Sequence, residues 1–442
     1  TAMTIATQIM LGVSSSQYGG ETITVTHLAP FVRDSFNKYK IKYLERGINE
    51  EEAEKWATED TEKEIEDGVQ TFNYQLNSMT NTNGQSPFCS VFFWLNEDPE
   101  YTKEIAMITK EFFKQRIKGI KNKAGVYQTQ AFPKLLYCLD ENNITEDSEY
   151  WWLTKLAAEC TAKRMVPDYI SAKKMKELKG DVYPCMGCRS FLSPDPKNHQ
   201  YYGRFNCGVS TINLPYVALE AKRDNKDFFE VLDKYSELCH KAQKIRLQRL
   251  ENVTSDVAPI LWQYGAFSRL KEGESLHKLL HNNYCTSSLG YAGLYETVMI
   301  LTGETHSKKN TKGYDIGMKI MHYLNNKCNE WKAMEDVGYS LYGTPIESTT
   351  FKFAKALQKD FDIIEGLTDK NYVTNSYHVT PAEPISAFDK IDIEAEYQEL
   401  SPGGAISYIE TGNLQKNISA VLELIKYMYN KIMYCEMNTK SD

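Results

Sequence analysis

Residues 183–192 read Tyr-Pro-Cys-Met-Gly-Cys-Arg-Ser-Phe-Leu, and this stretch carries the sharpest pattern in the chain. Its two cysteines, Cys185 and Cys188, form a C-x-x-C pair. Such a pair can be half of a zinc site, but zinc needs a second pair or histidines at defined spacing, and no second C-x-x-C exists here. A thioredoxin-like dithiol is another interpretation, although no thioredoxin-like βαβ pattern surrounds it. From spacing alone, two buried structural cysteines are the favoured interpretation.

On both sides of this stretch, short apolar segments alternate with long helical ones. Strands are predicted at 88–95, 134–139, 207–214, 287–291, 339–342, 371–378 and 405–410. Helices are predicted at 3–17, 49–76, 100–118, 148–164, 216–250, 345–359 and 413–429, with another ending at 301. This alternation predicts βα units around a mostly parallel sheet. So many units in one chain favour a closed α/β barrel over an open sheet.

The composition limits the classes of partner. The net charge is −8, from 51 Lys and Arg against 59 Asp and Glu, which argues against binding to a nucleic-acid backbone. A nucleotide substrate remains compatible, because one triphosphate needs only a local pocket. No apolar run reaches the length of a membrane span. Ten scattered cysteines without a secretory signal favour a reducing cytoplasm and free thiols.

Common ligand-binding patterns are missing from the sequence. The eight histidines are expected to be dispersed and to form no ligand-spaced cluster, so no metal site is predicted. There is no G-x-x-x-x-G-K-[ST] phosphate loop and no G-x-G-x-x-G fingerprint. Nucleotide binding in this chain would therefore use neither of those devices.

Residues 186–192, Met-Gly-Cys-Arg-Ser-Phe-Leu, resemble the thiyl-radical loop of anaerobic (class III) ribonucleoside-triphosphate reductases, which are glycyl-radical enzymes. Residues 203–215, Gly-Arg-Phe-Asn-Cys-Gly-Val-Ser-Thr-Ile-Asn-Leu-Pro, resemble a second stretch of that family. Further matches follow in order at 14–20, 83–88, 163–168, 288–291, 339–345 and 374–378. Each stretch alone is a weak signal. In order and over nearly the whole chain, they are specific.

The resemblance implies a fold and a chemistry. The fold is a ten-stranded α/β barrel of the glycyl-radical enzyme type, incomplete at both ends, with residues 1–442 as a single catalytic domain. By position, Cys188 is the cysteine at the tip of a loop inside that barrel. A glycyl radical removes its hydrogen, and the resulting thiyl removes the 3′-hydrogen of a ribonucleotide. A closed barrel excludes water from such a radical, and a rigid loop fixes the sulfur against the sugar.

Two neighbours of Cys188 match the members of the family that use formate as reductant. They are Asn206 and Met186. An amide such as Asn206 can donate to a carboxylate or to a ribose hydroxyl, although a turn residue is the simpler interpretation. Packing explains Met186 equally well. Cys185 and Cys207 receive no role from the resemblance.

A third constellation lies at residues 340–349, where a strand runs into a Gly-Thr-Pro turn and then a helix. Thr suits an N-cap and Pro the first turn, and free N–H groups there can bind an anion. In ribonucleotide reductases a similar strand–turn–helix holds substrate phosphates, so the resemblance assigns that role to Gly343, Thr344, Glu347 and Ser348. An ordinary capped helix is the alternative. Glu347 could also cap the N–H groups itself and compete with a phosphate.

The resemblance further implies parts and partners outside these residues. Expected to be absent from the chain are the N-terminal ATP-cone domain, the first barrel segment, the C-terminal four-cysteine zinc module and the glycyl-radical loop. Family members are homodimers with ATP and dNTP effectors and a radical-SAM activating protein. Two alternatives stay open: another glycyl-radical enzyme acting on pyruvate and formate or on a diol, and a radical-deficient barrel with a binding or regulatory role. The motif at 186–190 with Asn206 favours the reductases, because the acyltransferases use adjacent cysteines.

Overall fold

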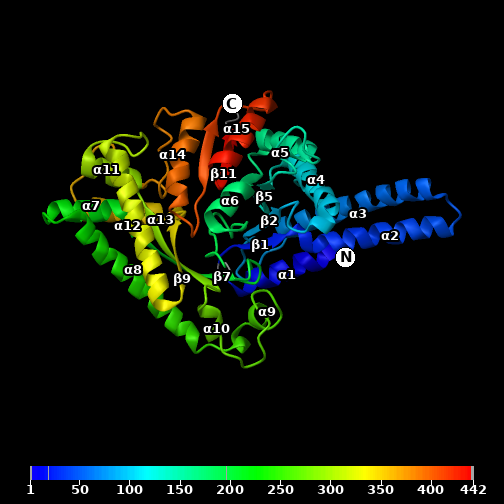
Figure 1. Cartoon of the computed structure of the whole chain (residues 1–442), viewed down its shortest axis with the longest axis horizontal. Coiled ribbons are helices and arrows are strands. Elements are labelled where there is room, and N and C mark those ends of the chain that lie inside the picture. Colours follow the sequence, from blue (N-terminus) through cyan, green and yellow to red (C-terminus); the bar gives the residue numbers. More distant parts are fainter. Residues whose placement is uncertain (1, 18, 196, 440–442) are drawn as a thin grey trace. The chain divides into compact units, whose positions relative to one another are not determined.

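The computed structural model describes residues 2–17, 19–195 and 197–439. Tyr18, within the matching stretch 14–20, therefore lies outside the described residues, as do Pro196 and residues 440–442. The described residues form two compact units (Figure 1). One contains the chain up to Lys173, Glu410–Asn430 and the residues from Cys435 onward; the other contains Lys174–Ile409 and Lys431–Tyr434. The expectation of one catalytic domain over residues 1–442 stays a prediction.

Most residues of a six-stranded sheet, in the order β1-β2-β5-β6-β11-β10, belong to the first unit. Its strands are β1 (Glu21–Thr24), β2 (Cys89–Phe93), β5 (Lys134–Leu139), β6 (Asp168–Ser171), β11 (Tyr434–Thr439) and β10 (Ser407–Thr411). The pairs β1–β2, β2–β5 and β5–β6 are all parallel. Nearly every residue of β2 and β5 is buried, which explains why both read as continuous apolar runs. A short hairpin, β3 (Ile120–Lys121) with β4 (Tyr127–Gln128), lies apart from this sheet.

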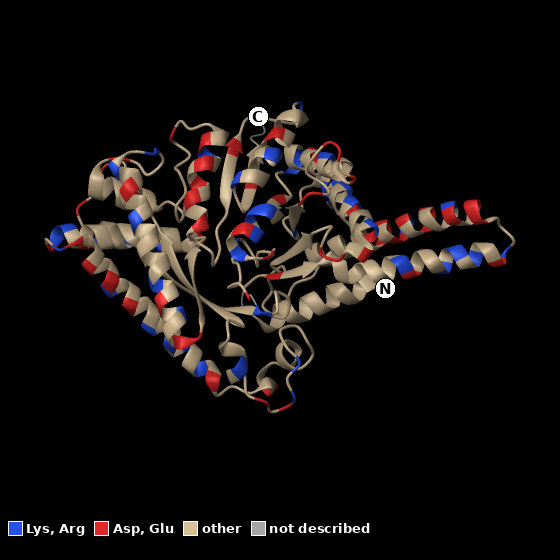
Figure 2. Ribbon diagram, viewed as in Figure 1, with Lys and Arg blue, Asp and Glu red and all other residues tan. Residues whose placement is uncertain are grey.

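Long helices accompany this sheet. They are α1 (Ala2–Ser16), α2 (Ala29–Glu45), α3 (Glu50–Ser78), α4 (Thr102–Lys118), α5 (Trp151–Arg164) and α15 (Ile418–Lys431). The side chain of Asn49 caps α3 by accepting from the backbone N–H of Glu52 at 2.9 Å. Helices α2 and α3 form an antiparallel pair whose outer part carries many charged residues (Figure 2). Lys40 of α2 joins the pair through Glu50 and Glu54 of α3.

The second unit contains a three-stranded parallel sheet in the order β7-β8-β9. Its strands are β7 (Phe205–Asn213), β8 (Cys285–Ala292) and β9 (Gly338–Gly343). Its helices are α6 (Ala172–Lys179), α7 (Leu214–Arg223), α8 (Phe228–Glu251), α9 (Pro259–Trp262), α10 (His277–Leu280), α11 (Leu294–Thr302), α12 (Lys312–Glu335), α13 (Glu347–Asp360) and α14 (Ala387–Glu399). Helices α8 and α12 pack along the sheet (Figure 1). Each strand leads into a helix, so the predicted βα units are confirmed.

Two predicted elements differ from the structure. The helix predicted over 216–250 is two helices, because the side chain of Asp227 starts α8 by accepting from the N–H groups of Phe229 and Glu230. The strand predicted at 371–378 is wrong. There the backbone N–H groups bond side chains instead of a neighbouring strand: Val373 donates to Thr350 and Thr374 donates to Glu296. Within the described residues, no helix is both long and apolar enough to cross a membrane.

Candidate active site

Residues 186–190 form a tight hairpin with Cys188 at its tip. The backbones of Met186 and Ser190 exchange two hydrogen bonds, of 2.7 Å from the Met186 N–H and 3.2 Å from the Ser190 N–H. Only three residues remain in the turn, and the first, Gly187, has φ +59°, which glycine adopts at little cost. The turn therefore holds the half-buried Cys188 at a defined position. Met186 is half-buried at the base of the hairpin, where its backbone closes the turn.

The segment 401–404, Ser-Pro-Gly-Gly, ties this hairpin to strand β9. On the hairpin side, the N–H of Phe191 donates to the carbonyl of Gly403 at 2.9 Å. On the strand side, Gly403 donates to Leu341 and Gly343 donates to Gly404, both at 2.8 Å. We call this segment the glycine clamp. It fixes the hairpin relative to the strand that leads into α13.

The clamp has no room for a side chain at Gly404. A Cβ there would lie 2.3 Å from the carbonyl oxygen of Arg189 and 2.6 Å from ring carbons of Tyr342. The backbone of Gly404 also has φ +142°, which residues with a side chain rarely adopt. Sequence reasoning missed this position, although the Pro-Gly-Gly run at 402–404 was a signal for a special backbone.

The buried Tyr434 contacts the backbone of the hairpin. The hydroxyl of Tyr434 donates to the carbonyl of Cys188 at 3.3 Å, and the thiol of Cys185 donates to the same hydroxyl, also at 3.3 Å. Cys185 and Tyr434 are both fully buried. The two thiols of the C-x-x-C pair thus have different surroundings: Cys185 packs beneath the hairpin, and Cys188 stands at its tip.

The side chain that faces the Cys188 thiol is Glu347. The Sγ of Cys188 lies 3.9 Å from Oε1 of Glu347, within the range of a thiol donating to a carboxylate. Glu347 is the first residue of α13, and its carboxylate is exposed. Its φ of +26° is unusual for a residue with a side chain, and such strain is often found at functional positions. Of the four residues expected to bind phosphate, Glu347 is the one brought next to the sulfur.

The other three residues of the predicted phosphate site are in different situations. The N–H of Gly343 is used by the glycine clamp, and the hydroxyl of the buried Thr344 is 3.1 Å from that of Thr211. Ser348 is exposed in the first turn of α13. The N–H of the preceding Ile346 donates to Asn375 at 3.2 Å. The first-turn N–H groups of α13 after Ile346 are thus the ones left to bind an anion, because helix geometry gives them no internal acceptor.

Asn206 connects the sheet to the hairpin. Its Nδ2 donates to Ser190 at 3.2 Å and to Ser288 of β8 at 2.8 Å, and its Oδ1 accepts from the N–H of Gly208 at 2.7 Å. A bulge in β7, marked by a register shift between Asn206 and Val209, accompanies this arrangement. The structure therefore brings Asn206 to the loop that carries Cys188, as the resemblance implied.

Arg189 was not singled out from the sequence. It is 2% exposed, and its Nη2 donates to the hydroxyl of Tyr408 at 3.0 Å. Its Nε and Nη1 are buried without an acceptor among the described residues. Burial, and then the positive charge of Arg189, hold the pKa of the nearby His378 well below its ordinary value, so this histidine is neutral. This buried cation, whose guanidinium also lies over the ring of Tyr408, directly follows Cys188 in the chain.

Two of the eight histidines lie close together in the structure, contrary to the expectation from the sequence. His277 and His281 are four residues apart, and the structure brings them together with Glu251, with one potential ligand atom from each within 4.8 Å of the others. The expectation that the histidines form no ligand-spaced cluster is therefore wrong. The H-x-x-x-H spacing of residues 277–281 was the available signal.

The family model described as anaerobic ribonucleoside-triphosphate reductase matches residues 1–442. The chain belongs to this family. The anaerobic reductase of Salmonella typhimurium is 36% identical over 451 residues, covering 100% of this chain and 62% of that protein. The reductase of Enterobacteria phage T4 is 34% identical over 462 residues, covering 100% and 72%. The chain thus spans about three fifths of the bacterial reductase.

Solved structures of other proteins align with this chain over most of its length and show the same fold. The anaerobic ribonucleotide reductase from Thermotoga maritima with citrate in the active site aligns with a TM-score of 0.69 at 16% identity, covering 99% of this chain and 74% of that one. The same enzyme with dATP bound in the specificity site gives 0.70 at 17%, covering 99% and 70%. A structure described for 1,2-propanediol dehydration in Roseburia inulinivorans gives 0.54 at 12%, covering 90% and 57%. The α/β fold of the glycyl-radical enzyme type is confirmed.

Proposed function

We propose that residues 1–442 form one catalytic barrel domain that reduces ribonucleoside triphosphates to deoxyribonucleoside triphosphates with a thiyl radical on Cys188. The observation that carries this proposal is the hairpin at 186–190, closed by two backbone hydrogen bonds with a half-buried thiol at its tip. Membership of the reductase family supports it. The Thermotoga maritima reductase, which has been solved with dATP and CTP, adds support for nucleotide ligands.

The hairpin suits radical chemistry on sulfur. A glycyl radical would supply the one-electron oxidising power, and the Cys188 thiol would give up its hydrogen atom to it. The partial exposure of Cys188 leaves its sulfur accessible for that transfer and for contact with a sugar. The glycine clamp and Tyr434 hold the backbone around Cys188 from both sides. A sulfur held this firmly can select one hydrogen of the ribose, the 3′-hydrogen, because small displacements cost large factors in rate.

Glu347 and the first turn of α13 contact different parts of the nucleotide. The carboxylate of Glu347 faces the sulfur at 3.9 Å, so it meets the ribose and accepts a proton from a sugar hydroxyl. The N–H groups at the start of α13, with Ser348, bind the phosphates, where negative charge is favoured. Gly343 and Thr344 contribute by shaping the turn before the helix. This division keeps the negative carboxylate of Glu347 off the phosphate position.

Formate is the proposed reductant. Asn206 places two amide donor bonds on Ser190 and Ser288, next to the Cys188 loop. Either bond can be exchanged for one to a carboxylate oxygen of formate, while the Oδ1 bond to Gly208 keeps the side chain in place. Met186, at the base of the hairpin, supplies an apolar surface for the same small molecule.

The remaining proposals concern the whole protein. By analogy with the Thermotoga maritima enzyme, which binds dATP in a specificity site, ATP and dNTPs are proposed as effectors. A homodimer, a radical-SAM activating protein and a zinc-binding module are proposed from the family resemblance. None of the ten cysteines forms a disulfide with another described residue, which supports a reducing cytoplasm as the proposed location.

The test is turnover by the full-length protein, activated anaerobically with its activating protein and supplied with formate. Cys188→Ser is expected to abolish deoxynucleotide formation while the glycyl radical still gives its electron paramagnetic resonance signal. Cys239→Ser, at a half-buried thiol on α8, is the matched control and should keep its activity. Deoxynucleotide formation by Cys188→Ser would refute the assignment. Turnover of a diol or of pyruvate, with none of ribonucleotides, would favour another glycyl-radical enzyme.

A further inference from the structure

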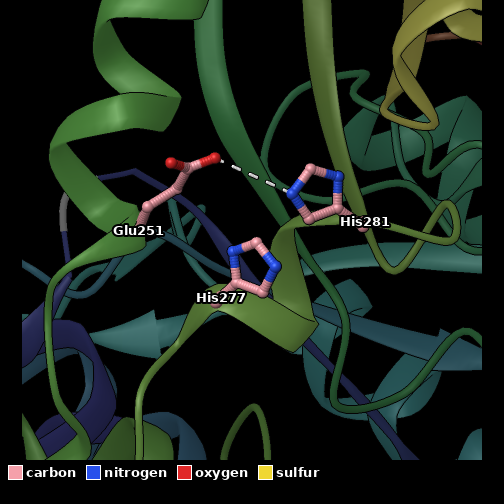
Figure 3. A group of neighbouring side chains, drawn as sticks. All are labelled: Glu251, His277 and His281. Carbon is pink, nitrogen blue, oxygen red and sulfur yellow. Dashed lines mark ion pairs between the residues drawn. The ribbon is translucent and has the colours of Figure 1, made fainter.

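Outside the active site, one cluster of side chains has the composition of a metal site. Glu251 is the last residue of α8, His277 is the first of α10, and His281 directly follows α10. One ligand atom from each lies within 4.8 Å of the others, and Figure 3 shows the three side chains turned toward a common point. We propose that Glu251, His277 and His281 bind a divalent transition-metal ion of the zinc type, with water completing the coordination.

The distances suit an ion better than direct contact. Nε2 of His281 and the Glu251 carboxylate are 3.8 Å apart, too far for a good hydrogen bond. Ligand atoms bound to a tetrahedral zinc at its usual bond lengths are about 3.4 Å apart. Side-chain rotations that shift the ligand atoms by about 1 Å therefore bring all three ligands into place. The backbone need not move.

The backbones that carry the ligands are already joined. The hydroxyl of Ser275 donates to the carbonyl of Glu251 at 3.0 Å and accepts from the N–H of His277 at 3.1 Å. One serine thus links two of the three ligand residues directly. Next to it, the N–H of Leu276 donates to the carbonyl of Val253 at 2.9 Å.

Burial of the opposite face fixes the orientation of the two histidines. Leu276, Leu279 and Leu280 are 1%, 5% and 1% exposed and anchor α10 in the core. His277 and His281, four residues apart, are left on the outward side, with His277 exposed and His281 half-buried. Both rings are therefore accessible to an ion from solvent.

Charge and ligand type also favour a transition metal. The carboxylate of Glu251 lies at the C-terminal end of α8, where the helix dipole disfavours a negative charge and favours a cation. A bound dication relieves that conflict. Imidazole nitrogen is a ligand for zinc, cobalt and nickel, whereas magnesium and calcium prefer oxygen. Two histidines and one carboxylate select the first group.

The bound ion would join the end of α8 to the segment that enters β8. That segment includes Tyr284, whose hydroxyl donates to the carbonyls of Gly203 and Phe267. The ion therefore stabilises the loops between α8 and β8. This inference does not depend on the reductase activity, since none of its ligands belongs to the proposed active site.

The experiment measures metal in the full-length protein and in the double variant His277→Ala/His281→Ala. After dialysis against zinc and gel filtration, the wild type should hold one equivalent more than the double variant. With cobalt, the spectrum of the wild type minus that of the double variant should show weak visible bands without the intense thiolate charge-transfer absorption that cysteine ligands give. His322→Ala, at an exposed histidine on α12, is the matched control and should keep the full metal content.

Glu251→Gln separates loss of a ligand from loss of structure, because it keeps the size of the side chain. It should weaken binding at least about tenfold while the circular dichroism spectrum stays unchanged. Zinc should also raise the unfolding midpoint of the wild type and leave that of the double variant unchanged. Equal metal content in wild type and double variant, or cobalt bands with thiolate character that disappear in the double variant, would overturn the proposal.

Discussion

Replacing Gly404 with alanine tests whether the glycine clamp fixes the hairpin that carries Cys188. The added Cβ would meet the carbonyl oxygen of Arg189 at 2.3 Å and the ring of Tyr342 at 2.6 Å. The clamp bonds the neighbouring residues Phe191 and Gly343, so a backbone shift that relieves these contacts would strain those bonds. Overpacking of this kind costs about 1–3 kcal/mol. The unfavourable backbone at φ +142° adds about 1–2 kcal/mol. We expect a loss of about 2–5 kcal/mol in the free energy of unfolding.

Two control variants separate these contributions. Gly47 has φ +82° and Gly412 has no unusual φ, and neither has an atom within 4 Å of the Cβ position. Gly47→Ala therefore reports a positive-φ backbone cost without overpacking, and Gly412→Ala reports neither cost. Urea unfolding followed by circular dichroism gives the stability of each variant.

Activity provides the second readout for Gly404→Ala. At a temperature where the variant is still folded, its deoxynucleotide formation should fall by more than tenfold, because the sulfur of Cys188 is displaced. The nucleotide affinity at α13 should change less. If Gly404→Ala were no more destabilising than Gly47→Ala and retained full turnover, the clamp would not fix the hairpin and the reasoning would be wrong.

Three further outcomes are expected. Asn206→Ala should lower formate-dependent turnover more than nucleotide binding, measured by steady-state kinetics and equilibrium dialysis; equal losses would indicate a structural role. Glu347→Gln should reduce kcat about 100-fold while nucleotide affinity is kept or improved, and weaker nucleotide binding would instead place Glu347 at the phosphates. Burial lowers the pKa of Lys179 to about 7 from 10.5, so the unfolded chain binds more protons between those values and stability rises with pH across that window. Lys179→Met should flatten this rise, measured as the difference in urea midpoint between pH 7 and pH 9; an unchanged slope would exclude Lys179 as its source.

The parts of the fold that the sequence predicted well are those with local causes. The strand predicted at 134–139 matches β5, because a continuous apolar run suits a strand buried on both faces. Strands β6 and β11 were missed because their sequences contain polar residues whose partners lie elsewhere. Asp168 of β6 is fully buried, and its charge is matched by Lys134 at 2.7 Å. No local sequence pattern predicts an ion pair between residues so far apart in the chain.

The site divides in the same way. Cys188, Met186 and Asn206 were reached through motifs that resemble the family, and the structure gathers them around one hairpin. Tyr434 and the glycine clamp contact that hairpin from more than two hundred residues away in the chain. Contacts over such separations depend on the assembled fold, so a sequence without aligned relatives gives no sign of them.

The close fit at Gly404 also limits how this protein can vary. Every single-nucleotide change in a glycine codon that alters the residue introduces a side chain, and all those side chains begin with the Cβ that the site excludes. No single-nucleotide substitution of Gly404 is therefore conservative. A lineage that lost this glycine would have to reshape the backbone of Arg189 or the ring of Tyr342 at the same time. We expect Gly404 to tolerate less natural variation than the buried Cys185, whose neighbours could accommodate a residue of similar size.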